Sequence, residues 1–154
     1  MKLVSLLSLV LLIFITGCTP TDIFQHESFS VSLPRWEQQQ VTTSSLGFIT
    51  GISTTDNSCT VHFTFSRTPL LQAAKLQLDS FSSLGNLTVY DKFVSETEVF
   101  FSYGLSSDEK FYRGDLHIMA CTNDFTYVLD YRCTLAVYED RAEEIFTLLD
   151  SMQC

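Results

Sequence analysis

An apolar segment at the amino terminus decides which residues are available to fold. Leu3–Ile15 is almost unbroken in its hydrophobicity and follows the positively charged start Met1-Lys2. A helix that spans a bilayer needs roughly 20 apolar residues, so this segment is too short for one. A charged start, a short apolar core and small residues after it are typical of a secretory signal. We therefore expect residues 1–17 of the 154 to be removed, which leaves 137 residues, the size of one domain.

The residues that end this segment, Ile15-Thr16-Gly17-Cys18, resemble the lipobox of bacterial lipoproteins. The resemblance implies that Cys18 is the lipid attachment site and carries acyl chains such as palmitate, since two or more chains anchor a protein stably. Residues 18–26 would then be a tether. In such lipoproteins an Asp after the cysteine retains the protein at the inner membrane. Thr19 stands there instead, which favours the periplasmic face of the outer membrane if the organism has two membranes. The alternative is an ordinary signal peptide or short anchor in which Cys18 is incidental.

The charge of the remaining chain excludes several kinds of partner. Loss of Lys2 leaves eight basic residues against eighteen acidic ones, a formal balance of −10. Nucleic-acid binding requires a basic surface that displaces counterions, so we expect no nucleic-acid partner. A polybasic contact with anionic lipids is excluded for the same reason. The acidic residues are therefore interpreted as a solvated surface, with binding of a cationic partner as the alternative.

Four cysteines remain after Cys18, and an even number in an exported domain predicts two disulfides. Buried free thiols are the alternative. Cys121 and Cys133 are expected on neighbouring strands but near opposite ends of their hairpin, too far apart to be bonded. A final helix running back along the last strand brings Cys154 near Cys121. We therefore favour Cys121–Cys154, which leaves Cys59–Cys133.

Hydrophobic periodicity predicts one α+β domain over residues 27–154. Alternating or short apolar runs predict strands at Ser28–Leu33, Leu46–Ser53, Cys59–Phe65, Leu87–Val94, Glu98–Tyr103, Phe111–Thr122 and Phe125–Val137. The polar run from Gln38 to Ser45 is interpreted as a loop or an edge strand. Helical spacing predicts a helix through Ser83, with Leu70, Leu71, Ala74, Leu78 and Phe81 as its apolar stripe. Its predicted start is Thr68-Pro69, with the Thr68 hydroxyl as the N-cap and Pro69 at the first helical position. A second helix, Glu139–Met152, has the stripe Ala142, Ile145, Phe146, Leu149 and Met152. The order indicates a single antiparallel sheet of about six to seven strands flanked by two helices.

Several of these features together resemble the PsbP-like superfamily, which includes DcrB-like bacterial lipoproteins. They are the strand Phe29-Ser-Val-Ser-Leu-Pro34 with Trp36 just beyond, a central helix ending in Phe81, and the strand Phe125-Thr-Tyr-Val-Leu leading into Tyr138. A last helix with Phe146, Leu149 and Met152 completes the pattern, which covers nearly the whole mature chain. The resemblance implies an α/β/α sandwich that acts through protein contacts and not through catalysis. A fold shared by functionally diverse proteins does not transfer a specific function.

The residues that carry chemistry do not form a recognisable catalytic or metal site. Asp115 and His117 share a strand face, and we interpret them as a surface ion pair in preference to a catalytic dyad. Cys59 and His62 have CxxH spacing, but residues three apart on a strand point to opposite faces, so no metal site is expected. The glycines are isolated and no phosphate-binding loop occurs. We predict no cofactor and no enzymatic activity.

The predicted function is a lipid-anchored protein of the cell envelope that binds an unidentified envelope protein or helps an assembly form. Phe100-Phe101 and Phe111-Tyr112 each place one ring on either face of a strand, so part of the sheet is expected to expose aromatic side chains for docking. The alternative for these rings is that loops and helices cover both faces. A small-molecule or lipid-binding periplasmic domain is the alternative function, and a hydrolase is the third.

Overall fold

The computed structural model describes residues 21–26, 28–34, 38–44, 47–54, 56–107, 110–122 and 124–154. The predicted signal peptide, Cys18 and Trp36 lie outside the described residues. The strands are β1 (Thr21–His26), β2 (Phe29–Pro34), β3 (Gln38–Ser44), β4 (Gly47–Ser53), β5 (Cys59–Ser66), β6 (Asn86–Val94), β7 (Glu98–Ser107), β8 (Lys110–Ala120) and β9 (Thr126–Thr134). The helices are α1 (Leu70–Leu84), α2 (Leu135–Tyr138), the 3-10 turn η1 (Glu139–Arg141) and α3 (Ala142–Asp150).

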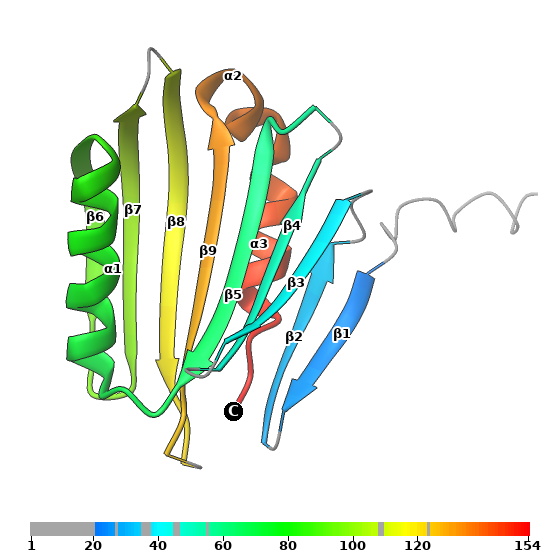
Figure 1. The fold of residues 1–154 in the computed structure, drawn as a ribbon, viewed down its shortest axis with the longest axis vertical. Coiled ribbons are helices and arrows are strands. Elements are labelled where there is room, and N and C mark those ends of the chain that lie inside the picture. Colours follow the sequence, from blue (N-terminus) through cyan, green and yellow to red (C-terminus); the bar gives the residue numbers. More distant parts are fainter. Residues whose placement is uncertain are drawn as a thin grey trace, which may run out of the picture.

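Seven of the strands form one antiparallel sheet in the order β3-β4-β5-β9-β8-β7-β6. The last strand, β9, therefore lies in the middle, between β5 and β8. Helix α1 lies on one face of this sheet, and α3 lies on the other (Figure 1). The α+β class and the antiparallel sheet between helices are confirmed.

The face under α1 has its own hydrophobic core. Leu70, Ala73, Ala74 and Phe81 of α1 are buried against apolar side chains of β7 and β8. Within β9, Val128 belongs to this core, whereas its neighbours Tyr127 and Leu129 belong to the core on the opposite face. The alternation of side chains along each strand thus separates the molecule into two cores.

The opposite core joins α3 and β2 to β5 and β9. Phe29, Val31 and Leu33 are buried, as the alternation in this strand predicts. The ring of Phe29 stacks on Tyr127 with 3.8 Å between centroids. Strand β2 therefore contributes to the core through its side chains, although it is not hydrogen-bonded into the large sheet.

The amino-terminal part differs from the expected single sheet. Thr21–His26, predicted to be tether, form β1 and pair with β2 as a separate two-stranded sheet. Gln38–Ser44, for which loop and edge strand were both open, is the edge strand β3. A polar sequence is compatible with an edge because one side of the strand remains available to water.

Both helices depart from their predicted boundaries. Helix α1 begins at Leu70 with Pro69 at the cap position and no side-chain cap, so the predicted capping by Thr68 is wrong. The predicted helix Glu139–Met152 is divided into the 3-10 turn η1 and the helix α3, and α2 replaces the end of the predicted strand Phe125–Val137. Two stripe positions are also wrong: Leu71 is exposed, and Phe146 is 65% exposed. Leu148 takes the buried place on α3.

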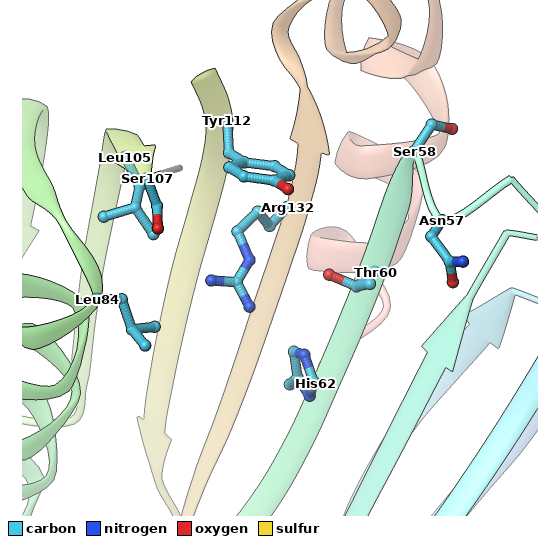
Figure 2. Close-up of a pocket in the computed structure, with 9 residues that line it drawn as sticks. All are labelled: Asn57, Ser58, Thr60, His62, Leu84, Leu105, Ser107, Tyr112 and Arg132. Atoms are coloured by element: carbon cyan, nitrogen blue, oxygen red, sulfur yellow. The ribbon is translucent and has the colours of Figure 1, made fainter. Parts of the chain in front are cut away.

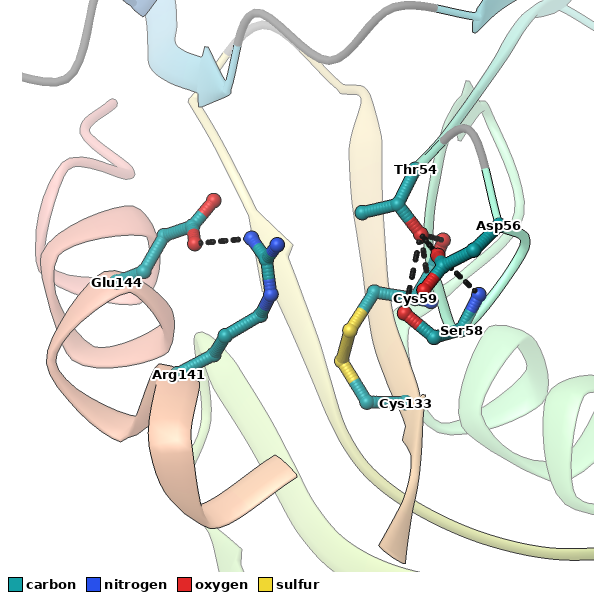
Figure 3. Close-up of a disulfide and its surroundings, with 7 residues drawn as sticks. All are labelled: Thr54, Asp56, Ser58, Cys59, Cys133, Arg141 and Glu144. Carbon is teal, nitrogen blue, oxygen red and sulfur yellow. Dashed lines mark hydrogen bonds and ion pairs between the residues drawn. A yellow bond between two sulfur atoms is a disulfide. The ribbon is translucent and has the colours of Figure 1, made fainter. Parts of the chain in front are cut away.

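Two disulfides close the fold, with the pairing that the sequence favoured. Cys59 and Cys133 are directly opposite each other on β5 and β9 (Figure 3). Beside them, the Ser58 N–H and the Thr54 hydroxyl donate to the Asp56 carboxylate and lower the pKa of Asp56 to about 2. Cys121 is joined to Cys154, with 5.5 Å between their Cα atoms.

Candidate functional site

A cavity of about 330 Å³ opens on the face of the sheet beside α1 (Figure 2). Its polar end consists of Asn57 and Ser58 from the turn before β5, Thr60 and His62 from β5, and Arg132 from β9. Its apolar end consists of Leu84 from the end of α1, Leu105 from β7 and Tyr112 from β8, with Ser107 close by. The cavity exists because α1 covers only part of this face, over β6, β7, β8 and part of β9.

A buried polar group forms the floor next to this cavity. Asp130 is only 4% exposed and lies on β9 directly opposite His62 on β5. The Tyr103 hydroxyl donates to Asp130 Oδ1 at 2.5 Å. Tyr103 is on β7, so its side chain must cross β8 to reach β9. Gly114 makes this crossing possible, since a Cβ there would lie 2.7 Å from the Tyr103 ring.

Arg132 is the charged partner of this group. Its Nη2 lies 3.7 Å from Asp130 Oδ2, which is an ion pair but longer than a hydrogen bond. Its guanidinium also lies over the Phe81 ring, 5.8 Å from the centroid. The side chain is 17% exposed, so the guanidinium is held between α1 and the sheet with limited access to water.

Burial dominates the electrostatics of the group. Removal from water raises the pKa of Asp130, against the opposing effects of Arg132, Tyr103 and His62. Burial likewise raises the pKa of Tyr103 well above its ordinary value, and the Asp130 charge adds to this shift. Burial lowers the pKa of His62, although the nearby Asp130 charge opposes this change. Burial thus favours the neutral imidazole of His62, which can donate one hydrogen bond and accept another.

The structure confirms the predicted opposite faces for one of the two candidate pairs, Cys59 with His62, and contradicts the predicted contact of the other, Asp115 with His117. Cys59 is buried in the α3-side core, whereas His62 lines the cavity on the other face, as the strand geometry predicts. In the part of the chain that the structure describes, no group of three potential metal ligands occurs. The expected Asp115–His117 pair is wrong. His117 Nε2 instead lies 2.7 Å from Glu98 Oε1.

Asp115 accepts a hydrogen bond from the Tyr138 hydroxyl of α2. Burial raises the pKa of Asp115, and the donors Tyr138 and Ser102 reduce that shift. Burial and the hydrogen bond to Asp115 raise the pKa of Tyr138 to about 12. The Asp115 carboxylate therefore has a structural role in attaching α2 to β8.

Exposed aromatic side chains gather on the face of β6, β7 and β8 that is opposite α1. Tyr90 is 49%, Phe93 53% and Phe111 38% exposed, and Phe100 beneath them is half-buried. We call these four residues the β6–β8 aromatic surface. Phe93 lies opposite Phe100 across the strands, and Phe100 contacts the His117 ring edge to face. Helix α3 lies behind β9, β5 and β4, away from β6 and β7 (Figure 1).

Tyr90 and Phe111 are brought together over a glycine. A Cβ at Gly104 would lie 2.5 Å from the Tyr90 hydroxyl and 2.8 Å from the Phe111 ring. The guanidinium of Arg113 lies between the rings of Tyr90 and Tyr138, 4.8 Å and 5.3 Å from their centroids. This cation–π arrangement holds Tyr90 in place at the surface.

Strand β6 is the edge of the sheet, but its backbone is protected from adding another strand. The register shifts between Val89 and Asp91, which places Tyr90 in a bulge. The Lys92 N–H donates to Asp91 Oδ1 at 2.8 Å, so a side chain already satisfies this donor. Bulges and charged residues are the usual protection of an edge strand. A partner at this end of the sheet would therefore contact the aromatic surface and not the strand edge.

Comparison with known proteins places the fold. No family model and no curated protein matches the sequence. Among solved structures, cyanobacterial PsbP (CyanoP) from Synechocystis is similar with a TM-score of 0.60 at 8% identity, over 90% of this chain and 94% of that chain. LpqN, involved in cell envelope biogenesis of Mycobacterium tuberculosis, is similar with a TM-score of 0.54 at 11% identity, over 87% and 90%.

The Ran-binding protein Mog1p of Saccharomyces cerevisiae is also similar, with a TM-score of 0.55 at 6% identity, over 88% of this chain and 95% of that chain. At these identities the likeness shows the fold alone. The PsbP-like fold expected from the sequence is thus confirmed.

Sequence reasoning missed Tyr103, Asp130 and Arg132. A signal for two of them was present, since Asp130 and Arg132 are charged residues within the apolar run Tyr127-Val-Leu-Asp-Tyr-Arg-Cys133. The same two-residue spacing places both on one face of β9.

Proposed function

We propose that this chain is a lipid-anchored protein of the cell envelope that binds another protein without catalysing a reaction. The lipobox-like Ile15-Thr16-Gly17-Cys18 supports the anchor, with Cys18 as the lipid attachment site. No helix in the described part of the chain is long and apolar enough to cross a membrane. The similar folds of LpqN, an envelope biogenesis protein, and of Mog1p, a Ran-binding protein, support a binding role.

The β6–β8 aromatic surface is the observation that carries the proposal. Interfaces are enriched in aromatic side chains, and rings held rigidly lose little entropy on binding. Phe93 and Phe111 are separated by six residues along β7, through their opposite neighbours Phe100 and Ser106. At about 3.3 Å per residue this is roughly 20 Å, a span suited to a protein partner.

The charges around this surface define the partner further. Asp91 and Glu98 lie on the same strands as Phe93 and Phe100, and the chain as a whole is strongly acidic. Lys110 and Arg113 lie beside Phe111 at the other end of the surface. The partner is therefore an envelope protein that presents an apolar patch with basic side chains at the end that meets Asp91 and Glu98. Complementary charges of this kind accelerate encounter and reject wrong partners.

Site-specific photo-cross-linking in intact cell envelopes tests the docking surface. A photoreactive phenylalanine analogue is placed at Phe93 or at Phe111, and at Phe146 as a matched control, because Phe146 is an exposed Phe on α3. We expect one envelope protein to be captured from both β6–β8 positions and not from Phe146. Phe93→Asp should abolish capture from Phe111, and Phe146→Asp should leave it unchanged. Equal capture from all three positions, or capture insensitive to Phe93→Asp, refutes the docking surface.

Mass spectrometry of the amino-terminal peptide tests the anchor independently. We expect acyl mass on Cys18 and none after Cys18→Ser. An unmodified Cys18 in the membrane fraction would refute lipidation and leave the docking result unaffected.

A further inference from the structure

The cavity beside α1 has a composition suited to a particular class of ligand. Its lining includes the guanidinium of Arg132 and the imidazole of His62, and no carboxylate among the described residues. We propose that this cavity binds a small carboxylic acid in its ionised form, with the carboxylate on Arg132 and an apolar group against Leu84 and Leu105. This site lies on the face opposite the β6–β8 aromatic surface and goes beyond the proposed function.

Arg132 has hydrogen-bonding capacity directed at the cavity. A guanidinium carries five N–H donors in a planar fork, which matches the two oxygens of a carboxylate. Its polar partner among the described residues is Asp130, at 3.7 Å, beyond hydrogen-bonding distance. Asp130 Oδ1 is already occupied by the Tyr103 hydroxyl. In Figure 2 the guanidinium extends along the sheet between Leu84 and His62, into the space that these residues line.

Asp130 positions this guanidinium through the ion pair at 3.7 Å. The carboxyl is buried in the floor of the sheet, whereas Arg132 reaches the cavity. The Phe81 ring, whose centroid lies 5.8 Å from the guanidinium carbon, is a second contact that restrains the side chain. An arginine held in this way loses little further entropy when it binds a carboxylate.

The remaining lining supplies the other contacts. Thr60 and His62 offer a hydroxyl and a ring N–H beside Arg132, while Leu84, Leu105 and Tyr112 form the apolar end. A volume of about 330 Å³ is at the small end of the range for ligand cavities. The ligand is therefore a small acid with one short aliphatic or aromatic group.

Titration calorimetry and NMR on the full chain test this site, with hexanoate and 3-phenylpropionate as probes. Titration of the same probes into the detergent solution without protein is the blank. The matching alcohols and inorganic phosphate are the comparison ligands. We expect the carboxylates to bind about tenfold or more tightly than the alcohols and phosphate. The side-chain N–H resonance of Arg132 should shift on binding, and that of Arg113, on the opposite face, should not.

Two sets of variants make the result decisive. Arg132→Gln should weaken carboxylate binding about tenfold or more, and Lys75→Gln, which removes an exposed positive charge on α1, should not. Because Arg132→Gln leaves Asp130 without its partner, a second test avoids the buried group. Leu84 is exposed at the rim, so Leu84→Glu should weaken carboxylate binding about threefold or more relative to the uncharged Leu84→Gln. Equal affinity for acids and alcohols, equal affinity for phosphate, no saturable binding of either acid, or equal binding by both Leu84 variants overturns the proposal.

Discussion

Removal of the Cys121–Cys154 disulfide tests how the carboxyl-terminal segment is attached to the sheet. The two cysteines are 33 residues apart, and the loop between them contains β9, α2 and α3. The entropy that a cross-link removes from the unfolded chain grows with the logarithm of loop length, which for this loop gives about 3.7 kcal/mol at about 25 °C. We therefore expect Cys121→Ala with Cys154→Ala to lower the free energy of unfolding by about 3–4 kcal/mol.

The double variant should remain folded, because other contacts hold the same segment. Ser30 of β2 exchanges two backbone hydrogen bonds with Gln153, each 2.9 Å long. Met152 is buried in the α3-side core, and the Ser151 hydroxyl accepts the Ser32 N–H at 2.9 Å. Near-UV circular dichroism should therefore be retained in the absence of denaturant.

Urea denaturation of the oxidised wild-type chain and the variant measures the change, with Cys59→Ala and Cys133→Ala as the comparison. That disulfide closes a separation of 74 residues, for which the same relation gives about 4.4 kcal/mol. Both of its cysteines are also fully buried, so their truncation removes packing as well. A loss below about 1 kcal/mol for the Cys121–Cys154 variant, or a loss larger than that of the Cys59–Cys133 variant, would refute the reasoning.

Three further changes probe the interior. Gly114→Ala should destabilise the fold by about 1–3 kcal/mol in urea denaturation, since its Cβ would collide with Tyr103 and with a backbone oxygen 2.6 Å away. Unchanged stability would contradict the path of the Tyr103 side chain over Gly114 of β8. Phe29→Ala should cost about 3–5 kcal/mol if β2 packs in the core, and a cost below about 1 kcal/mol would show that it does not. Asp115 has a raised pKa in the folded state, so its stabilising contribution is complete below its unfolded pKa and is lost as pH rises through the folded value. The stability of wild type relative to Asp115→Asn should therefore fall as the pH rises from about 4, the unfolded pKa of an aspartate, through the raised pKa of the folded state. In Tyr138→Phe, which lacks a donor that lowers this pKa, the fall should extend to higher pH; a difference independent of pH would contradict the burial of Asp115.

The alternation of apolar and polar residues was sufficient to predict which side chains are buried in strands that have one apolar and one polar face. In β2 and β5, apolar residues alternate with polar ones, and the structure buries Phe29, Val31, Val61 and Phe63 accordingly. Patterning was insufficient where a residue's exposure depends on how far a neighbouring element extends. Phe146 fits the helical stripe of α3, yet it is exposed, because the covering partners lie on the side of Leu148.

The candidate cavity depended even more on long-range pairing. His62 and Asp130 are far apart in the chain and meet because β5 pairs with β9, the last strand. Tyr103 reaches Asp130 only because β8 offers Gly114 between them. Neither contact has a local signal, since each depends on the strand order of the sheet.

The sequence by itself determined the α+β class, the positions of most strands, the likeness to PsbP-like folds and the disulfide pairing that the structure also has. The class, the strands and the pairing follow from side-chain periodicity and from the direction in which adjacent elements must run, and both are local properties of the chain. The likeness to PsbP-like folds rests instead on the resemblance of several short motifs and their order. Only the tertiary structure decided that β1 and β2 form their own small sheet, that β9 is central, and which aromatic and charged side chains face solvent or a cavity. Those outcomes depend on contacts between distant segments, where the burial of one face is set by whichever element happens to cover it.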